Sequence, residues 1–147
     1  MAIDRSWKHT PPPPEVIEQK MLAATTAKVR AKPSNTESDI QISCVNWFRV
    51  QYPQFAGVFY AVPNGGKRDK KTAFFLNREG VLAGVSDIIL DVARNGYHGL
   101  RIEMKRPGGE HQKTQKAFEK AVTEQGYLYT LCYSFEEFEK IINNYLK

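Results

Sequence analysis

Residues 85–106 read VSDIILDVARNGYHGLRIEMKR, and this stretch decides the fold. Two aliphatic runs flank the turn-forming pair Asn95-Gly96, which is the pattern of two antiparallel strands joined as a hairpin. Glu and Lys are depleted in strands, yet Glu103 and Lys105 occupy alternate positions in the second run. The hairpin is therefore expected to carry a polar face as well as an apolar one.

Alternation of side chains along a strand sorts the hairpin into these two faces. The apolar face takes Ser86, Ile88, Leu90 and Val92 from the first strand and Leu100, Ile102 and Met104 from the second. Matching the apolar faces places Asp87, Glu103 and Lys105 together on the other face. A two-residue turn would instead pair Asp87 with Met104 and mix the faces, so we predict an odd-length loop or a β-bulge.

Two carboxylates beside an ammonium group suit a divalent metal site. Mg²⁺ and Mn²⁺ prefer oxygen ligands, commonly one or two carboxylates completed by waters and phosphate oxygens. A lysine beside such a metal can position or help activate a coordinated water. An ordinary cross-strand salt bridge, worth ~0.2–1 kcal/mol, accounts for the same residues. The spacing alone leaves both interpretations open.

The composition fits one soluble domain. The chain has 147 residues, and 21 Lys and Arg against 16 Asp and Glu give a formal charge of +5, a mild preference for polyanionic partners. We find no apolar run of the ~18–20 residues that a transmembrane helix needs and no signal-peptide core, so we expect a cytoplasmic protein without a membrane partner. Cys44 and Cys132 lie in apolar patterns and are expected to be buried thiols.

The remaining segments predict a mixed α/β domain with helices against one central sheet. In order, we expect a helix from the capping box Ser34–Glu37 to near Pro53, a strand at 57–62, a short helix ending at Gly80, strands at 85–94 and 98–106, a helix at about 113–124, a strand at 127–133 and a helix opened by the capping box Ser134–Glu137. The prolines of HTPPPPEV favour polyproline II. Residues 1–33 are therefore expected to be a flexible arm, and residues 34–147 the folded domain.

With Asp87 followed by Glu103-Met104-Lys105, the chain resembles the PD-(D/E)XK nuclease superfamily, and more of it resembles one branch, the VRR-NUC domain. The features that carry this resemblance stand in order: Glu37 with Ile40-Gln41, PNGG (63–66) with Lys67-Arg68, GVLAGVSD (80–87), EMK (103–105) and Gln115. They span roughly residues 37–146. One departure is Ser86, which stands where the family pattern usually has proline.

The resemblance implies a restriction-endonuclease-like α-β-β-β-α-β core and a Mg²⁺- or Mn²⁺-dependent DNA endonuclease that hydrolyses phosphodiester bonds. It implies that Asp87 and Glu103 are metal-binding carboxylates and that the backbone carbonyl of Met104 is a further ligand. Lys105 would be the catalytic lysine and Gln115 an accessory residue of the active site. For Glu37 two roles remain open, one at the active site and one as a helix-capping residue.

The resemblance also implies partners. Lys67, Arg68, Lys70, Lys71 and Arg106 would contact DNA phosphates, which give salt-dependent affinity with little sequence specificity; a solvated surface charge run is the alternative. Stand-alone members act on branched DNA such as Holliday junctions, often as homodimers, in bacterial or phage-infected cells. The rival functions are a non-catalytic nucleic-acid-binding or assembly module and an RNA-directed nuclease. We expect His98 and His111 to be ordinary surface residues.

Overall fold

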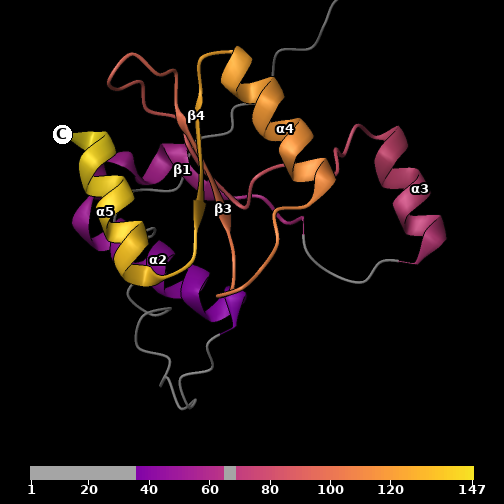
Figure 1. The fold of residues 1–147 in the computed structure, drawn as a ribbon, viewed down its shortest axis with the longest axis horizontal. Coiled ribbons are helices and arrows are strands. Elements are labelled where there is room, and N and C mark those ends of the chain that lie inside the picture. Colours follow the sequence, from indigo (N-terminus) through magenta and orange to yellow (C-terminus); the bar gives the residue numbers. More distant parts are fainter. Residues whose placement is uncertain (1–35, 65–68) are drawn as a thin grey trace, which may run out of the picture. The chain divides into compact units, whose positions relative to one another are not determined.

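The computed structural model describes residues 36–64 and 69–147. Ser34, the expected arm at 1–33, and the basic pair Lys67 and Arg68 lie outside the described residues. The elements follow in the order α2 (Glu37–Gln51), the 3-10 helix η1 (Pro53–Val58), β1 (Phe59–Ala61), α3 (Lys70–Arg78), β2 (Ile88–Leu90), β3 (Leu100–Met104), α4 (Lys113–Glu124), β4 (Leu128–Cys132) and α5 (Phe135–Leu146) (Figure 1). The predicted order of elements is confirmed.

The strands form one four-stranded sheet in the order β1-β2-β3-β4. The first two pairs are antiparallel, whereas β3 and β4 are parallel and are joined by the crossover helix α4. This mixed sheet with flanking helices confirms the predicted α/β fold. The strands are shorter than predicted, because residues 53–58 form η1 and only Ile88–Leu90 of the run 85–94 pair as β2.

The hairpin contains the predicted irregularity. Asn95 and Gly96, with φ of 53° and 83°, form a two-residue turn closed by an Arg94–Tyr97 bridge. Continuing that register would place Leu90 opposite Arg101, yet Leu90 pairs with Leu100. The first strand therefore accommodates one extra residue between the turn and the ladder, and this shift restores the match of apolar with apolar side chains.

The apolar face of the hairpin packs against α2 and α5. The core brings together Cys44 and Phe48 of α2, Ile88, Leu90, Leu100, Ile102, Met104 and Cys132 of the sheet, and Phe138, Ile142 and Tyr145 of α5. Phe48 stacks on Phe59 at a centroid distance of 3.8 Å. Cys44 and Cys132 are buried free thiols, as predicted. Burial raises the pKa of Cys44 to about 12 and that of Cys132 to about 11, so both remain protonated.

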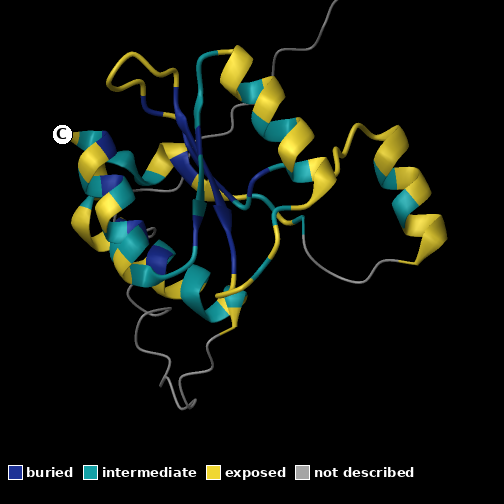
Figure 2. Cartoon of the chain, viewed as in Figure 1, coloured by how far each residue is buried: buried dark blue, intermediate teal, exposed yellow. Residues whose placement is uncertain are grey.

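The opposite face of β3 is buried as well, although it carries charges. Figure 2 shows the central strands as the buried layer between the helices. Arg101, Glu103 and Lys105 are all buried, with Tyr129 of β4 beside them. Helix α4 lies on this side, where Phe118 contacts the Tyr129 ring edge-on. The two faces of one strand thus differ in kind: one is core and the other is polar.

The helix starts show one correction. The N-cap of α2 is Thr36, whose side chain accepts a hydrogen bond from the Asp39 N–H at 3.3 Å. The predicted capping role of Glu37 is wrong, because Glu37 lies inside the first turn and its carboxylate accepts from the backbone N–H of Arg106. The sequence holds two overlapping capping patterns, and the one starting at Thr36 forms. For α5, Ser134 caps as predicted, accepting from the Glu137 N–H at 3.1 Å.

No helix in the described ranges is long and apolar enough to cross a membrane.

Replacing Ser86 should stabilise the domain. Its side chain is fully buried, and its hydroxyl has no hydrogen-bond partner among the described residues. Since an unsatisfied buried hydroxyl is unfavourable, we expect Ser86→Ala to raise the free energy of unfolding by about 1 kcal/mol, measured by urea denaturation. Ser134→Ala, which removes an N-cap, should lower it by about 1 kcal/mol. A loss of stability in Ser86→Ala would show that the hydroxyl contributes a favourable interaction.

Candidate active site

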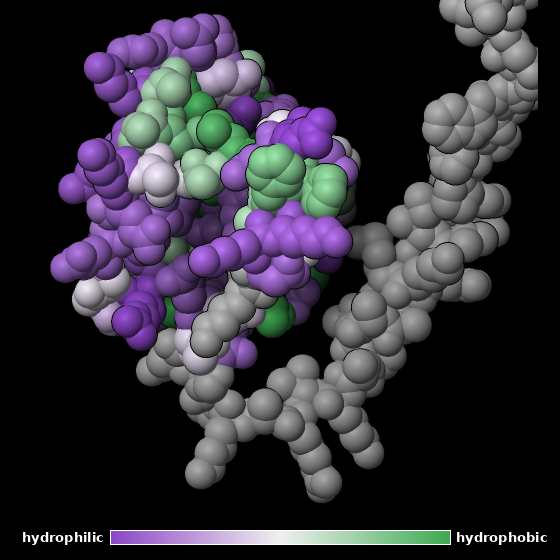
Figure 3. Space-filling model, turned by 90° about the vertical axis from the view of Figure 1, so that its right-hand side faces the viewer, coloured by the Kyte–Doolittle hydropathy of each residue, from purple (hydrophilic) through white to green (hydrophobic). Residues whose placement is uncertain are grey.

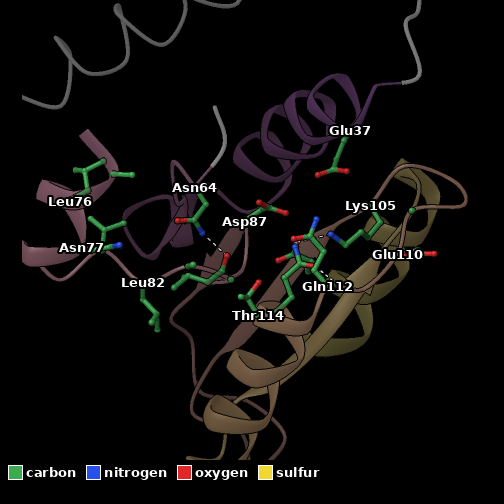
Figure 4. A pocket seen from close by; sticks show the side chains of 18 of the residues that line it. Glu37, Asn64, Leu76, Asn77, Leu82, Asp87, Lys105, Glu110, Gln112 and Thr114 are labelled. Atoms are coloured by element: carbon green, nitrogen blue, oxygen red, sulfur yellow. Dashed lines mark hydrogen bonds and ion pairs between the residues drawn. The ribbon is translucent and has the colours of Figure 1, made fainter. Parts of the chain in front are cut away.

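One cavity of about 600 Å³ collects the residues that the sequence selected. Its lining includes Glu37 from α2, Asp87 from the segment before β2, Glu103 from β3, Lys105 just after β3, and Gln115 from α4. Figure 4 shows Glu37, Asp87 and Lys105 around a common space, with Leu76 and Asn77 of α3 on the far side. Segments that are far apart in the sequence therefore contribute to one polar cavity.

Glu103 lies at the centre of this cluster. Its side chain is only 2% exposed, and its Oε1 atom forms an ion pair with the Lys105 ammonium at 3.0 Å. The side-chain amide of Gln115 donates to the same oxygen. The other oxygen, Oε2, is buried without a hydrogen-bond partner among the described residues. Glu103 is thus fixed in orientation by one oxygen, and its second oxygen has no hydrogen-bond partner among the described residues that would compete with a ligand.

Asp87 is attached to both neighbouring strands. Its Oδ2 atom accepts the backbone N–H of Met104 at 2.9 Å. Its own carbonyl accepts the Val62 N–H at 2.8 Å, just beyond β1. Met104 itself is fully buried in the core through its side chain, so only its backbone belongs to the polar face. These bonds hold the Asp87 carboxylate beside Glu103 across the hairpin.

The carboxylates of this cluster repel one another. Burial raises the pKa of Asp87, and the nearby charge of Glu37 raises it further, while the Met104 N–H and Lys105 act in the opposite direction. Burial and then the charge of Asp87 raise the pKa of Glu103 to about 7, and the Lys105 ion pair opposes this rise. Glu37 therefore belongs to the cluster electrostatically. The single ammonium of Lys105 leaves an excess of negative charge that a bound cation would offset.

The donor set fits a divalent cation held in an open site. No group of three or more His, Cys, Asp or Glu side chains is arranged to hold a metal within residues 36–64 and 69–147. Mg²⁺ and Mn²⁺ do not need such a group, because one or two carboxylates suffice when waters and substrate oxygens complete the shell. The orphaned Oε2 of Glu103, next to Asp87 in a 600 Å³ cavity, is a group of this kind.

Gln115 is held at both ends of its amide. Its Oε1 atom accepts the Gln112 N–H at 2.9 Å, and its Nε2 atom donates to Glu103.

The segment that leads to Asp87 packs closely on the start of α4: Gly84 has φ of +85°, and a Cβ there would lie 2.5 Å from the Thr114 carbonyl carbon. A glycine thus permits the approach of the Asp87 segment to the first turn of α4.

The basic residues divide into those at the cavity and those away from it. Arg106 is exposed and lines the cavity. Lys70 and Lys71 are exposed in the first turn of α3 and do not line it. Lys67 and Arg68 lie outside the described residues. The structure therefore brings one predicted phosphate-contacting residue, Arg106, to the candidate active site.

Two residues, His111 and Asn64, make contacts near the site that the sequence did not predict. His111 is half-buried, because its ring stacks on Tyr129 at a centroid distance of 5.7 Å and its Nδ1 atom lies 3.7 Å from the Glu119 carboxylate. The expectation of a surface residue holds for His98, which is exposed, and is wrong for His111. Asn64 lines the cavity, and its side-chain amide donates to the Val85 carbonyl. Only the PNGG pattern signalled Asn64, and nothing local in the sequence signalled His111.

The fold and the site define a class: an α/β nuclease fold in which a strand hairpin brings two carboxylates and a lysine into one cavity. The chain belongs to the VRR-NUC domain family, whose family model matches residues 35–136. This is generally a family of nuclease domains. A solved structure described as a VRR_NUC domain protein is similar, with 28% sequence identity and a TM-score of 0.65 over 76% of this chain and 88% of that chain. No curated protein matches the chain.

The raised pKa values predict how stability depends on pH. In the unfolded chain, Asp87 and Glu103 titrate near their ordinary values of 3.8 and 4.5, whereas the folded metal-free protein holds the Glu103 proton up to about pH 7. The folded state thus binds more protons in this window, so these groups should make the free energy of unfolding fall as pH rises from about 4.5 to about 7. Mg²⁺ or Mn²⁺ should reverse the loss, and most strongly above pH 7.

Thermal unfolding in EDTA between pH 5 and 8, followed by the same series with each metal, measures this effect. Asp87→Asn isolates the contribution of carboxylate repulsion to this pH dependence. The variant keeps an oxygen that can accept the Met104 N–H and removes one of the repelling charges. The wild-type melting temperature should fall relative to that of the variant as pH rises, and the metal-induced rise should shrink in the variant. A constant difference between the two proteins across the series would contradict the buried-charge account.

The close approach at Gly84 predicts a second effect. Gly84→Ala would place a Cβ against backbone atoms, whereas Gly80→Ala, at φ of +94°, would meet nothing within 4 Å. Gly80→Ala therefore measures backbone strain alone, about 1 kcal/mol. We expect Gly84→Ala to cost about 1–3 kcal/mol more in urea denaturation, since rigid backbone must move. Equal losses in the two variants would show that the packing of this segment on α4 is not tight.

Proposed function

We propose that this VRR-NUC domain is a Mg²⁺- or Mn²⁺-dependent endonuclease that hydrolyses DNA phosphodiester bonds. The observation that supports this most directly is the state of Glu103: one oxygen is fixed by Lys105 and Gln115, and the other is buried without a partner among the described residues. An arrangement that costs stability in the absence of a ligand is characteristic of functional sites.

Each residue of the cluster has a distinct part in this proposal. Asp87, Glu103 and the backbone carbonyl of Met104 would hold the metal, which when bound lowers the pKa of a water and offsets charge on the phosphate. Lys105 would keep its ammonium close to the attacking water and the phosphate oxygens. Gln115 would orient Glu103 through the hydrogen bond already present, and Glu37 would add negative charge at the edge of the site.

The substrate side of the proposal rests on positive charge. Arg106 at the cavity would contact a phosphate next to the scissile bond, and Lys70 and Lys71 would contact phosphates further away. We propose that Lys67 and Arg68 contact DNA phosphates in the same way. Branched DNA, including Holliday junctions, is the proposed substrate, and a homodimer would place two such sites on two strands. Residues 34–147 would form the nuclease domain, with 1–33 as an arm, in the cytoplasm of a bacterium or a phage-infected cell.

The alternative is a nucleic-acid-binding or assembly module that keeps the fold without catalysis. Such a module would have no use for a buried and a half-buried carboxylate with raised pKa values and an orphaned oxygen. Replacing Asp87 by a neutral residue would relieve the repulsion and leave the Glu103–Lys105 ion pair in place. The retained cluster therefore favours catalysis over the module.

A cleavage assay tests the proposal. We would incubate the full chain with duplex, single-stranded, flap and four-way-junction DNA, and with RNA of matched sequence, in Mg²⁺, Mn²⁺ or EDTA. Asp87→Asn should lower cleavage by more than about 100-fold, because even groups behind a metal ligand cost about 10- to 100-fold when changed. Glu124→Gln is the matched control: this exposed carboxylate at the end of α4 pairs with Lys120 at 4.0 Å and does not line the cavity, so cleavage should persist.

Cleavage that persists in Asp87→Asn would come from a contaminant or from another site and would contradict the proposal. Equal DNA binding by the wild type and Asp87→Asn, with no cutting of any substrate by either, would favour the non-catalytic module. Cutting of RNA alone would redirect the proposal to an RNA nuclease.

A further inference from the structure

Helix α3 presents two different faces. Ala73 and Leu76 are half-buried and, with Asn77, line the catalytic cavity. Phe74 and Phe75 point away from the domain, with 58% and 48% of their surface exposed. Figure 1 shows α3 set apart from the sheet and the other helices, and Figure 3, which views the domain from this side, shows apolar side chains projecting among hydrophilic ones. The two phenylalanines are therefore not part of the core.

The exposed face of α3 is also cationic. Lys70, Phe74 and Arg78 follow each other at four-residue spacing and so share one stripe of the helix, and Lys71 and Phe75 form the adjacent stripe. The Arg78 guanidinium lies 5.8 Å from the centre of the Phe74 ring. The rings of Phe74 and Phe75 meet edge to face at 5.8 Å. We call these five residues the aromatic–cationic face.

The acidic residues near this face do not neutralise it. Asp69 caps the helix, where its carboxylate accepts the backbone N–H of Thr72 at 2.9 Å and the Thr72 hydroxyl at 2.6 Å. Glu79 stands at the C-terminal end of the helix, beyond the phenylalanines. The face itself carries three cations and no carboxylate. Its chemistry is complementary to a partner that offers both flat apolar surfaces and negative charge.

Nucleic acid offers this combination. Bases stack on aromatic side chains regardless of sequence, and phosphates pair with Lys and Arg beside them. A second copy of the chain is a poorer match, because a two-fold contact places the same face against itself and would bring six cations together. The charge of the face therefore distinguishes between these two occupants and favours DNA.

The geometry of α3 restricts which DNA can use this face. One side of the helix lines the cavity that holds Asp87 and Glu103, and the aromatic–cationic face lies on the other side. A linear duplex seated in the cavity would leave the outer face unoccupied. A branched DNA can place one arm in the cavity and pass a second arm along the outer face, with the helix between them.

We propose that the aromatic–cationic face of α3 binds the second arm of a branched DNA, with Phe74 and Phe75 stacking on bases exposed at the branch. This inference rests on the proposed DNA nuclease function and adds the residues that would select the branch. Lys70, Lys71 and Arg78 then contact the phosphates of that second arm. Selectivity for branched DNA arises from contacts outside the catalytic cluster.

A binding experiment with the full chain tests this inference apart from catalysis. The protein carries Asp87→Asn, so that bound DNA stays intact. Two probes share one sequence: a forked DNA with 2-aminopurine at the branch and a linear duplex with 2-aminopurine at the same position. Fluorescence anisotropy gives the affinity, and 2-aminopurine emission reports stacking. The test variant is Phe74→Leu with Phe75→Leu, which keeps an apolar helix and removes the aromatic planes.

We expect the parent protein to prefer the fork and the Leu variant to bind the fork about tenfold more weakly, the fold-change that accompanies loss of a base–aromatic stack. The change in 2-aminopurine emission should disappear, and affinity for the linear duplex should stay the same. Tyr97→Leu is the matched control, since this aromatic residue is 38% exposed at the hairpin turn and lies outside the cavity. It should leave both affinities unchanged.

An unchanged ratio of fork to duplex affinity in the Leu variant overturns the inference. Sedimentation of the parent protein and of the variant Phe74→Ser with Phe75→Ser tests whether the face binds a second copy of the chain instead. A dimer that dissociates in the Ser variant, together with an unchanged ratio of fork to duplex affinity in the Leu variant, would assign the face to a second copy. Failure of the nuclease proposal is a separate result, because it shows as cleavage insensitive to Asp87→Asn, whereas this binding experiment needs no cutting.

Discussion

The structure depends on how β3 buries charge on one of its faces. Arg101, Glu103 and Lys105 alternate with core residues, and all three side chains are almost fully buried. Buried charges need partners, since an isolated one is strongly unfavourable. Lys105 pairs with Glu103 at 3.0 Å, and Arg101 pairs with Asp91 at 2.9 Å while its guanidinium stacks on Tyr127 at 4.2 Å. The polar face is stable because its members satisfy one another.

The carboxylates at the two ends of this polar face differ in how completely their oxygens are hydrogen-bonded. This difference distinguishes a structural ion pair at one end from a candidate ligand site at the other. At the Arg101 end, Asp91 also accepts the Tyr60 hydroxyl at 2.8 Å, so its two oxygens are both engaged. At the Glu103 end, one carboxylate oxygen has two donors and the other has none among the described residues. A fold that pairs one carboxylate of the polar face fully and leaves another incomplete has room for a ligand at the second position.

The sequence predicted the parts of this arrangement that follow from local periodicity. Parity along the hairpin placed Asp87, Glu103 and Lys105 together and required the extra residue that the register contains. The bounds of α4 could also be predicted from the sequence, because its apolar stripe and the following Gly126 are local signals. Contacts between segments that are far apart in the sequence could not be predicted from it. The close approach of Gly84 to Thr114 and the Tyr129–His111 stack both depend on tertiary geometry.

Helix α3 shows why apolar periodicity alone does not locate a core. The run Ala73–Leu76 is apolar throughout, and such a run normally indicates burial. In the structure Ala73 and Leu76 turn toward the cavity and the two phenylalanines turn outward, since no other described element packs over them. A hydrophobic pattern indicates which side chains are stabilised by burial. The surface that buries them can belong to a binding partner as well as to the chain itself. On this helix the flanking cations, and not the apolar residues, carry the information about which partner that is.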